Sequence, residues 1–123
     1  MARVLEGPGD GSAERWLNRT VRLDGLVIGR VEATLHDGIA EIAYLLGPAW
    51  WGHGYATEAV RRLLAELESL GLSEAWAVVD PANDRSAALL RRLGFVETEP
   101  TVRLVTMDPG DRAFVEAFTA WGQ

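Results

Sequence analysis

Apolar and polar residues alternate between residues 20 and 46, which is the pattern of strands that bury one face and expose the other. Asp24-Gly25 and Asp37-Gly38 interrupt this alternation. An Asp-Gly pair is typical of a tight hairpin turn, because glycine tolerates the positive φ that the turn requires. Gly29 breaks the alternation and indicates a β-bulge. We therefore predict an antiparallel meander with strands at 20–23, 26–36 and 39–46.

The spacing of apolar residues changes after this meander. They recur every three or four positions over about 55–70, which predicts an amphipathic helix. An unbroken apolar run then predicts a strand over 74–80 that is covered on both faces. A second helix is predicted over 84–93, with Asn83 as its N-cap. A glycine follows each helix, as expected at a C-terminal cap.

The remaining segments carry weaker patterns. Residues 3–6 are predicted to form a short strand, and a short helix is predicted from Ser12 to about Leu17. Two further strands are predicted at 95–98 and 101–107.

An apolar stripe near the end of the chain predicts a C-terminal helix within residues 108–123, from Asp111 to Trp121. The stripe consists of Phe114, Val115, Phe118 and Trp121. It would cover the sheet or form a contact in a homodimer, and packing on the core is the favoured interpretation.

The order of these elements indicates a mixed α/β (α+β) fold with one sheet and helices on both of its faces. A length of 123 residues suits a single domain, 1–123, and no internal repeat or linker divides it. At 48% hydrophobic residues, the chain can build one core.

Composition limits the possible partners. The net charge of −6 argues against nucleic acid as a partner and suits a cationic one, such as an amine or a basic peptide, although ordinary solubility explains it as well. With no cysteine, two histidines and no HExxH pattern, we expect no metal site. We find neither an apolar run of about 20 residues nor a signal sequence, so we expect no membrane segment and a cytoplasmic location.

The segment between the meander and the first helix has the strongest chemical signal. A strand ends, Gly52 and Gly54 allow close approach to the backbone, and a helix begins with unpaired amides. This arrangement favours an anion site, although a tight turn would also use both glycines. A Walker motif is excluded because no Gly-Lys-Ser/Thr follows. A dinucleotide-binding fingerprint would need Gly or Ala where Thr57 stands.

This segment resembles the GNAT superfamily of N-acetyltransferases. The family's pyrophosphate motif is Gln/Arg-x-x-Gly-x-Gly/Ala, and Gly54 and Ala56 match its last two positions. Trp51 stands where Gln or Arg is usual, but Trp-Gly-x-Gly-Tyr-Ala-Thr-Glu-Ala is typical of the RimJ/RimL branch, whose known members acetylate N-termini of ribosomal proteins. A second family motif, Asn83-x-x-Ser86 followed by Gly94-Phe95, lies at the expected distance. The resemblance covers roughly residues 20–107.

The resemblance implies that the chain binds acetyl-CoA. The third strand would pair its backbone with the pantetheine arm, and the loop amides would hold the pyrophosphate. Asn83 and Ser86 would flank the thioester end, although both residues also suit a helix cap. The implied cofactor contacts are Tyr44, Leu45, Leu46, Trp51, Gly52, His53, Gly54, Tyr55, Ala56, Thr57, Asn83 and Ser86.

The implied reaction is direct acetyl transfer to a primary amine, which includes a protein N-terminus. Glu41 is the candidate general base; the alternative is a surface glutamate on a strand. Many relatives protonate the leaving thiolate with a tyrosine on the second helix, and Leu90 occupies that position. The family also has a first strand and two helices before the meander, whereas residues 1–19 are an abbreviated version. The acceptor pocket is therefore expected to be open, completed by a second chain, or cut away because the sequence is trimmed.

Two other functions stay open from the sequence alone. The first is a CoA-binding sensor or interaction module without catalysis. It would explain why Leu90 stands at the tyrosine position and why the N-terminal region is short. A nucleotide-binding domain is the third, and least favoured, alternative.

Overall fold

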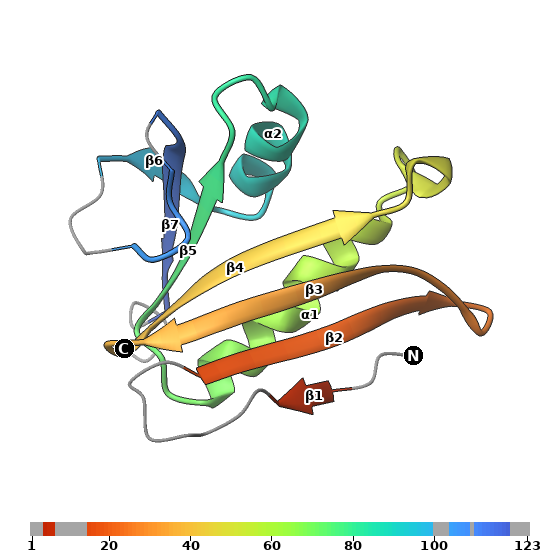
Figure 1. Ribbon diagram of the computed structural model, residues 1–123, viewed down its shortest axis with the longest axis horizontal. Coiled ribbons are helices and arrows are strands. Elements are labelled where there is room, and N and C mark those ends of the chain that lie inside the picture. The colour runs from red at the N-terminus through yellow and green to blue at the C-terminus, as the bar shows by residue number, and fades with distance from the viewer. Residues whose placement is uncertain (1–3, 7–14, 100–103, 109, 119–123) are drawn as a thin grey trace.

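The computed structural model describes residues 4–6, 15–99, 104–108 and 110–118. Within these residues, two α-helices and seven strands form one layered unit (Figure 1). The helices are α1 (Tyr55–Ser69) and α2 (Asp84–Arg92), and a 3₁₀ turn, η1, spans Pro48–Trp50. The strands are β1 (Val4–Glu6), β2 (Arg15–Leu23), β3 (Leu26–His36), β4 (Ile39–Leu46), β5 (Glu74–Val79), β6 (Val96–Thr98) and β7 (Arg112–Ala117).

The strands form one mixed sheet in the order β1-β2-β3-β4-β5-β7-β6. Only the central pair β4–β5 is parallel among the described strand pairs, and α1 makes the crossover between them. This confirms the predicted α/β fold with its antiparallel meander. The β4–β5 pairing runs only from Ile39 opposite Glu74 to Ile42 opposite Ala77. Beyond these residues the two strands diverge, which Figure 1 shows plainly.

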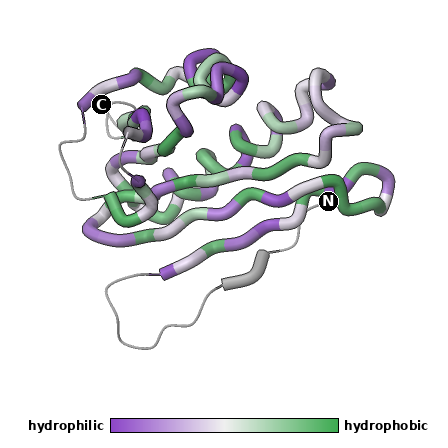
Figure 2. The backbone as a smooth tube through the Cα atoms, turned by 45° about the horizontal axis from the view of Figure 1, so that its top comes forward, coloured by the Kyte–Doolittle hydropathy of each residue, from purple (hydrophilic) through white to green (hydrophobic). Residues whose placement is uncertain are grey.

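Both predicted hairpin turns are present. Asp24 and Gly25 have φ of 51° and 83°, and Asp37 and Gly38 have φ of 53° and 78°. Two consecutive positive φ values define the turn that matches the twist of the flanking strands. In Figure 2, the tube changes between purple and green along β3. This alternation of hydrophilic and hydrophobic residues predicted the strand between the two turns.

The irregularity expected near Gly29 is also present. Val21 pairs with Gly29, but the next pair joins Arg22 to Val27, so Ile28 is the extra residue of a bulge. Gly29 itself has a packing role, because a Cβ atom there would lie 2.3 Å from the carbonyl oxygen of Leu45 on β4. Only glycine allows the two strands to approach this closely.

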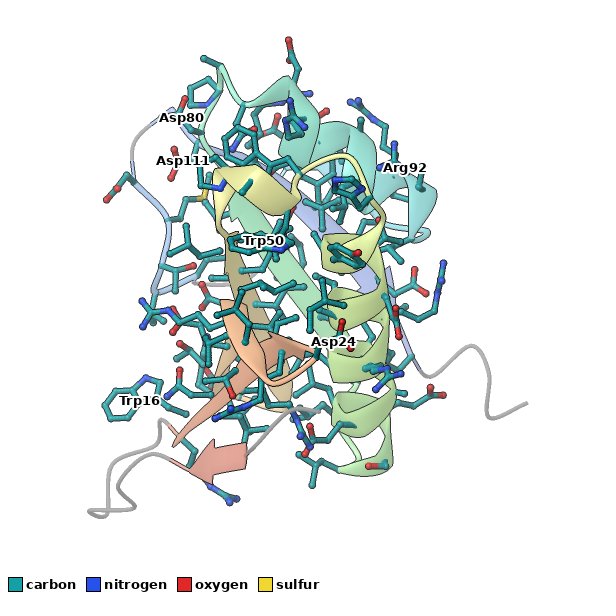
Figure 3. The ribbon with its side chains drawn as sticks, turned by 90° about the vertical axis from the view of Figure 1, so that its right-hand side faces the viewer. Trp16, Asp24, Trp50, Asp80, Arg92 and Asp111 are labelled. Carbon is teal, nitrogen blue, oxygen red and sulfur yellow. The ribbon has the colours of Figure 1, made fainter. Side chains whose placement is uncertain are left out.

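Both helices pack on the same face of the sheet, which corrects the expectation of helices on both faces (Figure 3). Alternate residues of the strands meet α1 and α2 in one core. Its largest members include Leu63, Leu67, Leu90 and Phe114. On the other face, Ile39, Trp76 and Ala113 form a smaller cluster with Leu104. The helices therefore do not cover this second face, and the segment before β7 packs against it instead.

The predicted C-terminal helix is wrong over the described residues, because Arg112–Ala117 form strand β7. Phe114 and Phe118 both belong to the core beneath the helices. Residues four apart share a face on a strand as well as on a helix, so the apolar stripe fitted both periods. Residues 112–117 form a strand because they pair with β5, where Val115 lies opposite Trp76. Trp121 lies outside the described residues.

Two other predicted elements also need correction. Residues 104–107 form no strand, and residues 101–103 lie outside the described part of the chain. Arg15 to Leu17, predicted to end a short helix, belong to β2 instead. Antiparallel pairing with β3 supplies the backbone hydrogen bonds that a helix would otherwise provide there.

Neither α1 nor α2 is long and apolar enough to cross a membrane. Within the described ranges, no group of three histidine, aspartate or glutamate side chains is close enough to hold a metal ion.

Candidate active site

The loop from β4 to α1 presents backbone amides at the start of a long helix. Gly52 and Gly54 both have φ of 81°, a region that side chains disfavour, and a Cβ at either would point into open space. Gly54 is the N-cap of α1 and has no side chain to occupy the amides that follow. The first helical hydrogen bond runs from Glu58 N to Gly54 O, at 3.0 Å. The preceding amides of the first turn are thus free to bind an anion.

Trp51 connects this loop to its surroundings. Its indole Nε1 donates a hydrogen bond of 2.9 Å to the carbonyl oxygen of Leu46, at the end of β4. The guanidinium of Arg85, from the first turn of α2, lies 4.8 Å from the centre of the indole ring. Such a cation–π contact holds the arginine over the aromatic face. Trp51 therefore fixes the loop and positions a cation beside it.

A pocket of about 200 Å³ joins the loop to one side of α2. The α2 part of this lining was not among the predicted contacts, although positions 85, 89 and 92 have the i, i+4, i+7 spacing of one helix face. Two of the three are arginines, which place positive charge beside the free amides. The full lining is Leu46, Trp50, Trp51, Gly52, Gly54, Tyr55, Ala56, Thr57, Arg85, Leu89 and Arg92.

A larger pocket, of about 410 Å³, lies between the β2–β3 hairpin and α1. It lacks the glycine-rich loop, and two of its arginines are already paired. Arg19 bonds Glu66, and Arg62 bonds Glu58. The smaller pocket is therefore the better anion site.

The edge of β4 that faces β5 is open at residues 44–46. These residues pair with β3 on their other side, from Val31 opposite Tyr44 to Gly29 opposite Leu46. The β5 pairing stops at Ile42, so the second edge of this segment has no strand partner among the described residues. An extended ligand has backbone donors and acceptors available there.

Three further predicted contacts belong to the start of α2 and to the loop before α1. Asn83 caps α2, because its Oδ1 accepts a hydrogen bond of 3.1 Å from the amide of Ser86. This confirms the capping interpretation, while the role of both residues toward a cofactor stays a prediction. His53 is exposed and its ring stacks on that of Tyr55, with centroids 5.5 Å apart.

The hydroxyl of Tyr44 is buried and has no hydrogen-bond partner of ordinary geometry. It lies on the side of β4 that faces the helices, close to Ser86 of α2. Burial raises the pKa of Tyr44, and the nearby Ser86 side chain lowers it only in part. The phenol therefore keeps its proton at neutral pH.

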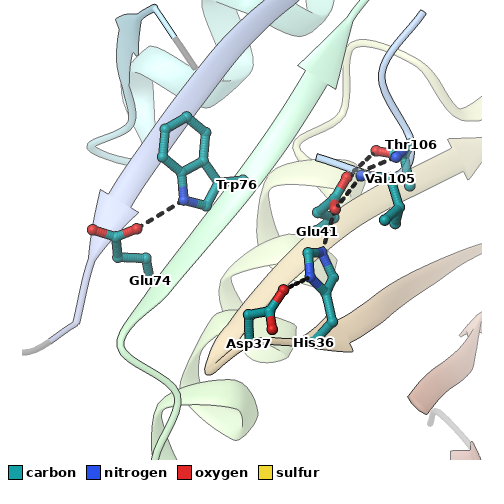
Figure 4. A network of polar contacts seen from close by, with 7 residues as sticks. All are labelled: His36, Asp37, Glu41, Glu74, Trp76, Val105 and Thr106. Atoms are coloured by element: carbon teal, nitrogen blue, oxygen red, sulfur yellow. Dashed lines mark hydrogen bonds and ion pairs between the residues drawn. The ribbon is translucent and has the colours of Figure 1, made fainter. Parts of the chain in front are cut away.

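Glu41 lies on the opposite side of β4 and is 2% exposed, so the alternative of a surface glutamate is wrong. Its carboxylate accepts hydrogen bonds from the amide of Val105 at 2.7 Å and the amide of Thr106 at 2.9 Å (Figure 4). The Thr106 hydroxyl bonds the same group at 2.5 Å. Glu41 thus fastens the segment before β7 to the sheet.

His36 completes this network from β3. Its Nε2 lies 2.5 Å from Glu41 Oε2, and its Nδ1 lies 3.0 Å from Asp37 Oδ2 (Figure 4). Burial lowers the pKa of His36, but the hydrogen bonds and negative charges of Asp37 and Glu41 outweigh it and raise the pKa overall. Burial likewise raises the pKa of Glu41, but the bonds from Thr106, Val105 and His36 outweigh it and lower the pKa. A charged pair is therefore favoured.

The features of this fold match a known group of enzymes. A profile of the acetyltransferase (GNAT) domain matches residues 3–96. The chain belongs to the GNAT acetyltransferase family. The uncharacterized N-acetyltransferase p20 of Bacillus licheniformis is 45% identical over 60 residues, which cover 48% of this chain and 34% of that protein. The chain thus aligns with about a third of the length of this curated relative.

Solved GNAT structures share the fold. A ribosomal-protein-alanine N-acetyltransferase from Brucella melitensis superposes with a TM-score of 0.70 at 18% identity, covering 83% of this chain and 68% of that one. The PaiA N-acetyltransferase from Thermoplasma acidophilum, in complex with coenzyme A, superposes with a TM-score of 0.69 at 16% identity, covering 85% and 61%. At these identities the likeness concerns the fold.

Proposed function

We propose that this chain is an N-acetyltransferase that moves an acetyl group from acetyl-CoA to a primary amine. The observation that carries the proposal is the pocket that joins the free amides after Gly54 to the cations Arg85 and Arg92. Backbone amides, a helix N-terminus and two guanidinium groups are suited to a pyrophosphate. The GNAT family uses acetyl-CoA, which carries that group.

The remaining contacts of acetyl-CoA follow from the same geometry. The pantetheine arm would run along the open edge of residues 44–46, between the diverging ends of β4 and β5. Asn83 and Ser86, at the start of α2, would lie beside its thioester end. Trp51, His53, Tyr55 and Thr57 would surround the phosphates.

A protein N-terminus is the acceptor that we favour. The Trp51–Ala59 segment resembles the RimJ/RimL branch, and one structural relative is named as a ribosomal-protein-alanine N-acetyltransferase. The net charge of −6 suits a basic peptide. The general-base role of Glu41 and a homodimer both stay predictions.

The alternative is a CoA-binding module without catalysis. Two observations favour it. Leu90, at the position where many relatives have a tyrosine, is fully buried and apolar. Glu41 has its carboxylate occupied by hydrogen bonds to His36 and Thr106.

Calorimetry with acetyl-CoA, CoA and NAD tests the ligand. We expect both CoA compounds to bind and NAD to bind far more weakly; tighter binding of NAD would overturn the proposal. Thiol release from acetyl-CoA then separates the enzyme from the binding module. The acceptors are peptides with a free N-terminal alanine or serine, the same peptides with a blocked N-terminus, and a polyamine. Release that requires the free N-terminus supports the favoured acceptor, and binding without release supports the module.

A further inference from the structure

The first residue of the glycine-rich motif has no donor to offer a phosphate. Trp51 stands where the family usually has Gln or Arg, whose side chains carry several N–H donors. An indole has a single donor, Nε1, and in Trp51 this donor is bonded to the carbonyl oxygen of Leu46 at 2.9 Å. The tryptophan therefore supplies neither a charge nor a free hydrogen bond at this position.

Arg85 brings a cation to the same place from α2. Its guanidinium lies 4.8 Å from the centre of the Trp51 ring, and both residues line the pocket of the glycine-rich loop. Among the described residues, Arg85 has no carboxylate partner, whereas Arg91 and Arg112 both bond Glu97. The charge of Arg85 is therefore available to an anion in the pocket.

Trp51 restricts where this charge can lie. Arg85 is exposed, and a free arginine side chain samples many rotamers that it must give up when it binds an anion. The ring of Trp51 is fixed by its bond to Leu46, and the cation–π contact keeps the guanidinium beside the ring. Part of the entropy loss has thus occurred before a ligand enters, which strengthens binding.

We propose that Arg85, positioned by Trp51, supplies the charged contact to the CoA pyrophosphate that Trp51 itself cannot make. This inference rests on the CoA-dependent function proposed above. The amides after Gly54 would hold one phosphate and the Arg85 guanidinium the other, so two partners on two helices favour a diphosphate over a single phosphate. Trp51 is a positioning residue in this arrangement, because it acts on the ligand through Arg85.

A double-mutant cycle tests whether Trp51 acts through Arg85. Calorimetry measures the Kd of CoA for the wild type, Trp51→Leu, Arg85→Gln and the double variant at low salt. We expect Arg85→Gln to weaken binding roughly tenfold and Trp51→Leu to weaken it roughly fivefold. In the Arg85→Gln background, Trp51→Leu should change the Kd by less than about twofold, since the cation that it positions is gone. Independent losses that multiply in the double variant would overturn the inference.

Two controls separate the aromatic face of Trp51 from its other contacts. Trp50 is half-buried and lines the same pocket, but no arginine stacks on it among the described residues. Trp50→Leu should therefore change the Kd of CoA by the same factor with and without Arg85. Trp51→Phe keeps an aromatic face and loses the bond to Leu46, so it should bind CoA more tightly than Trp51→Leu. Equal affinities of these two Trp51 variants would assign the loss to anchoring of the loop and contradict the inference.

An exchange of the two positions should restore binding. Trp51→Arg in the Arg85→Gln background returns a cation to the loop, where the family motif allows one, and should bring the Kd of CoA to within about threefold of the wild type. Ala88→Arg in the same background is the matched control, because Ala88 is exposed on α2 and lines neither pocket. Recovery by Ala88→Arg as large as that by Trp51→Arg, or no recovery by Trp51→Arg, would refute the assignment.

Dephospho-CoA identifies the phosphate that Arg85 contacts. It lacks the 3′-phosphate of CoA and keeps the pyrophosphate, so Arg85→Gln should weaken binding of both compounds by the same factor. A loss confined to CoA would assign Arg85 to the 3′-phosphate and overturn the proposal. A wild-type protein that binds neither CoA nor acetyl-CoA overturns the proposed function as well, whereas a wild type that binds CoA and an additive cycle together overturn this inference alone.

Discussion

The imidazole of His36 lies 2.5 Å from the carboxylate of Glu41, and both side chains are buried on the face of the sheet away from the helices. The same carboxylate holds the backbone of Val105 and Thr106. One acidic residue therefore joins β3, β4 and the segment before β7. This arrangement gives Glu41 a structural role that can be separated from a role as general base.

Glu41→Gln should lower the free energy of unfolding by about 1–3 kcal/mol, because the amide nitrogen cannot accept the hydrogen bonds that the carboxylate accepts. Urea unfolding measures this change. Glu32→Gln on β3 is the control, since Glu32 is not buried. If the folded variant instead lost kcat at all pH values while keeping wild-type stability, Glu41 would be the base and not a structural link.

The pair also predicts how stability depends on pH. Because its pKa is raised, His36 contributes stability to the fold. This stability is fully present below the ordinary histidine pKa of 6.5 and is lost as pH rises through the raised pKa. Because its pKa is lowered, Glu41 also contributes stability to the fold. This stability is present above the ordinary glutamate pKa of 4.5 and is lost as pH falls through the lowered pKa. The pair should therefore stabilise the fold most between these two ordinary values.

Urea unfolding from pH 4 to pH 9 tests this dependence. His36→Gln should remove the decline above about pH 6.5, because glutamine does not titrate. His53→Gln removes a histidine from the exposed loop and should leave the curve as in the wild type. An unchanged alkaline decline in His36→Gln would show that other groups cause it.

The glycine-rich loop predicts a matched pair of glycine substitutions. Gly54→Val should weaken CoA binding by roughly 10–100-fold, since a bulky side chain would separate the phosphates from one or two amides. Gly25→Val is the control, because Gly25 has φ of 83° against 81° for Gly54 and also faces open space. It carries the same backbone strain but does not line the pocket of the glycine-rich loop. Equal CoA affinity in both variants would refute the anion site.

The arginines of α2 should contribute charge to the same site. Arg85→Gln and Arg92→Gln should each weaken CoA binding by roughly tenfold at low salt, with a smaller effect at high salt, where screening reduces the charge contribution. Arg61→Gln removes an equal charge from an exposed position on α1 outside both pockets. Calorimetry at two salt concentrations measures the difference, and an effect of Arg61→Gln as large as that of Arg92→Gln would argue against direct contact.

A substitution at Gly29 should lower the stability of the fold without changing any residue that lines the proposed CoA pocket. Gly29→Ala should cost about 1–3 kcal/mol, because the added methyl group would meet the Leu45 carbonyl at 2.3 Å and backbone atoms cannot easily move. At Gly47 the nearest atoms, at 3.0 Å, belong to the Trp50 ring. A side chain can shift, so Gly47→Ala should cost less. Equal losses in urea unfolding would contradict the argument from Gly29.

Local signals were sufficient for much of this fold. Asp24-Gly25 and Asp37-Gly38 predicted the two turns, because the required φ values depend on the residues themselves. The three-to-four spacing predicted α1, and Asn83 predicted the start of α2 through a cap that spans three residues.

Non-local pairing decided what these signals could not. Residues 112–117 suited a helix by spacing, yet they form β7 because β5 offers an unpaired edge. The lining of the pocket required α2 to pack beside the loop, which brought Arg85 over Trp51.

The chemistry that is available could be predicted from the residues alone: the glycines at 52 and 54, the helix start that follows them, and the family resemblance they carry. Which side chains are isolated from water, and which of them meet, depended on how the strands and helices pack. Glu41 became buried and paired with His36, while Tyr44, three residues later, packs beneath the helices near Ser86 on the opposite side of the same strand. This difference arises because the two faces of a strand meet different partners, and contacts between residues far apart in the sequence determine those partners.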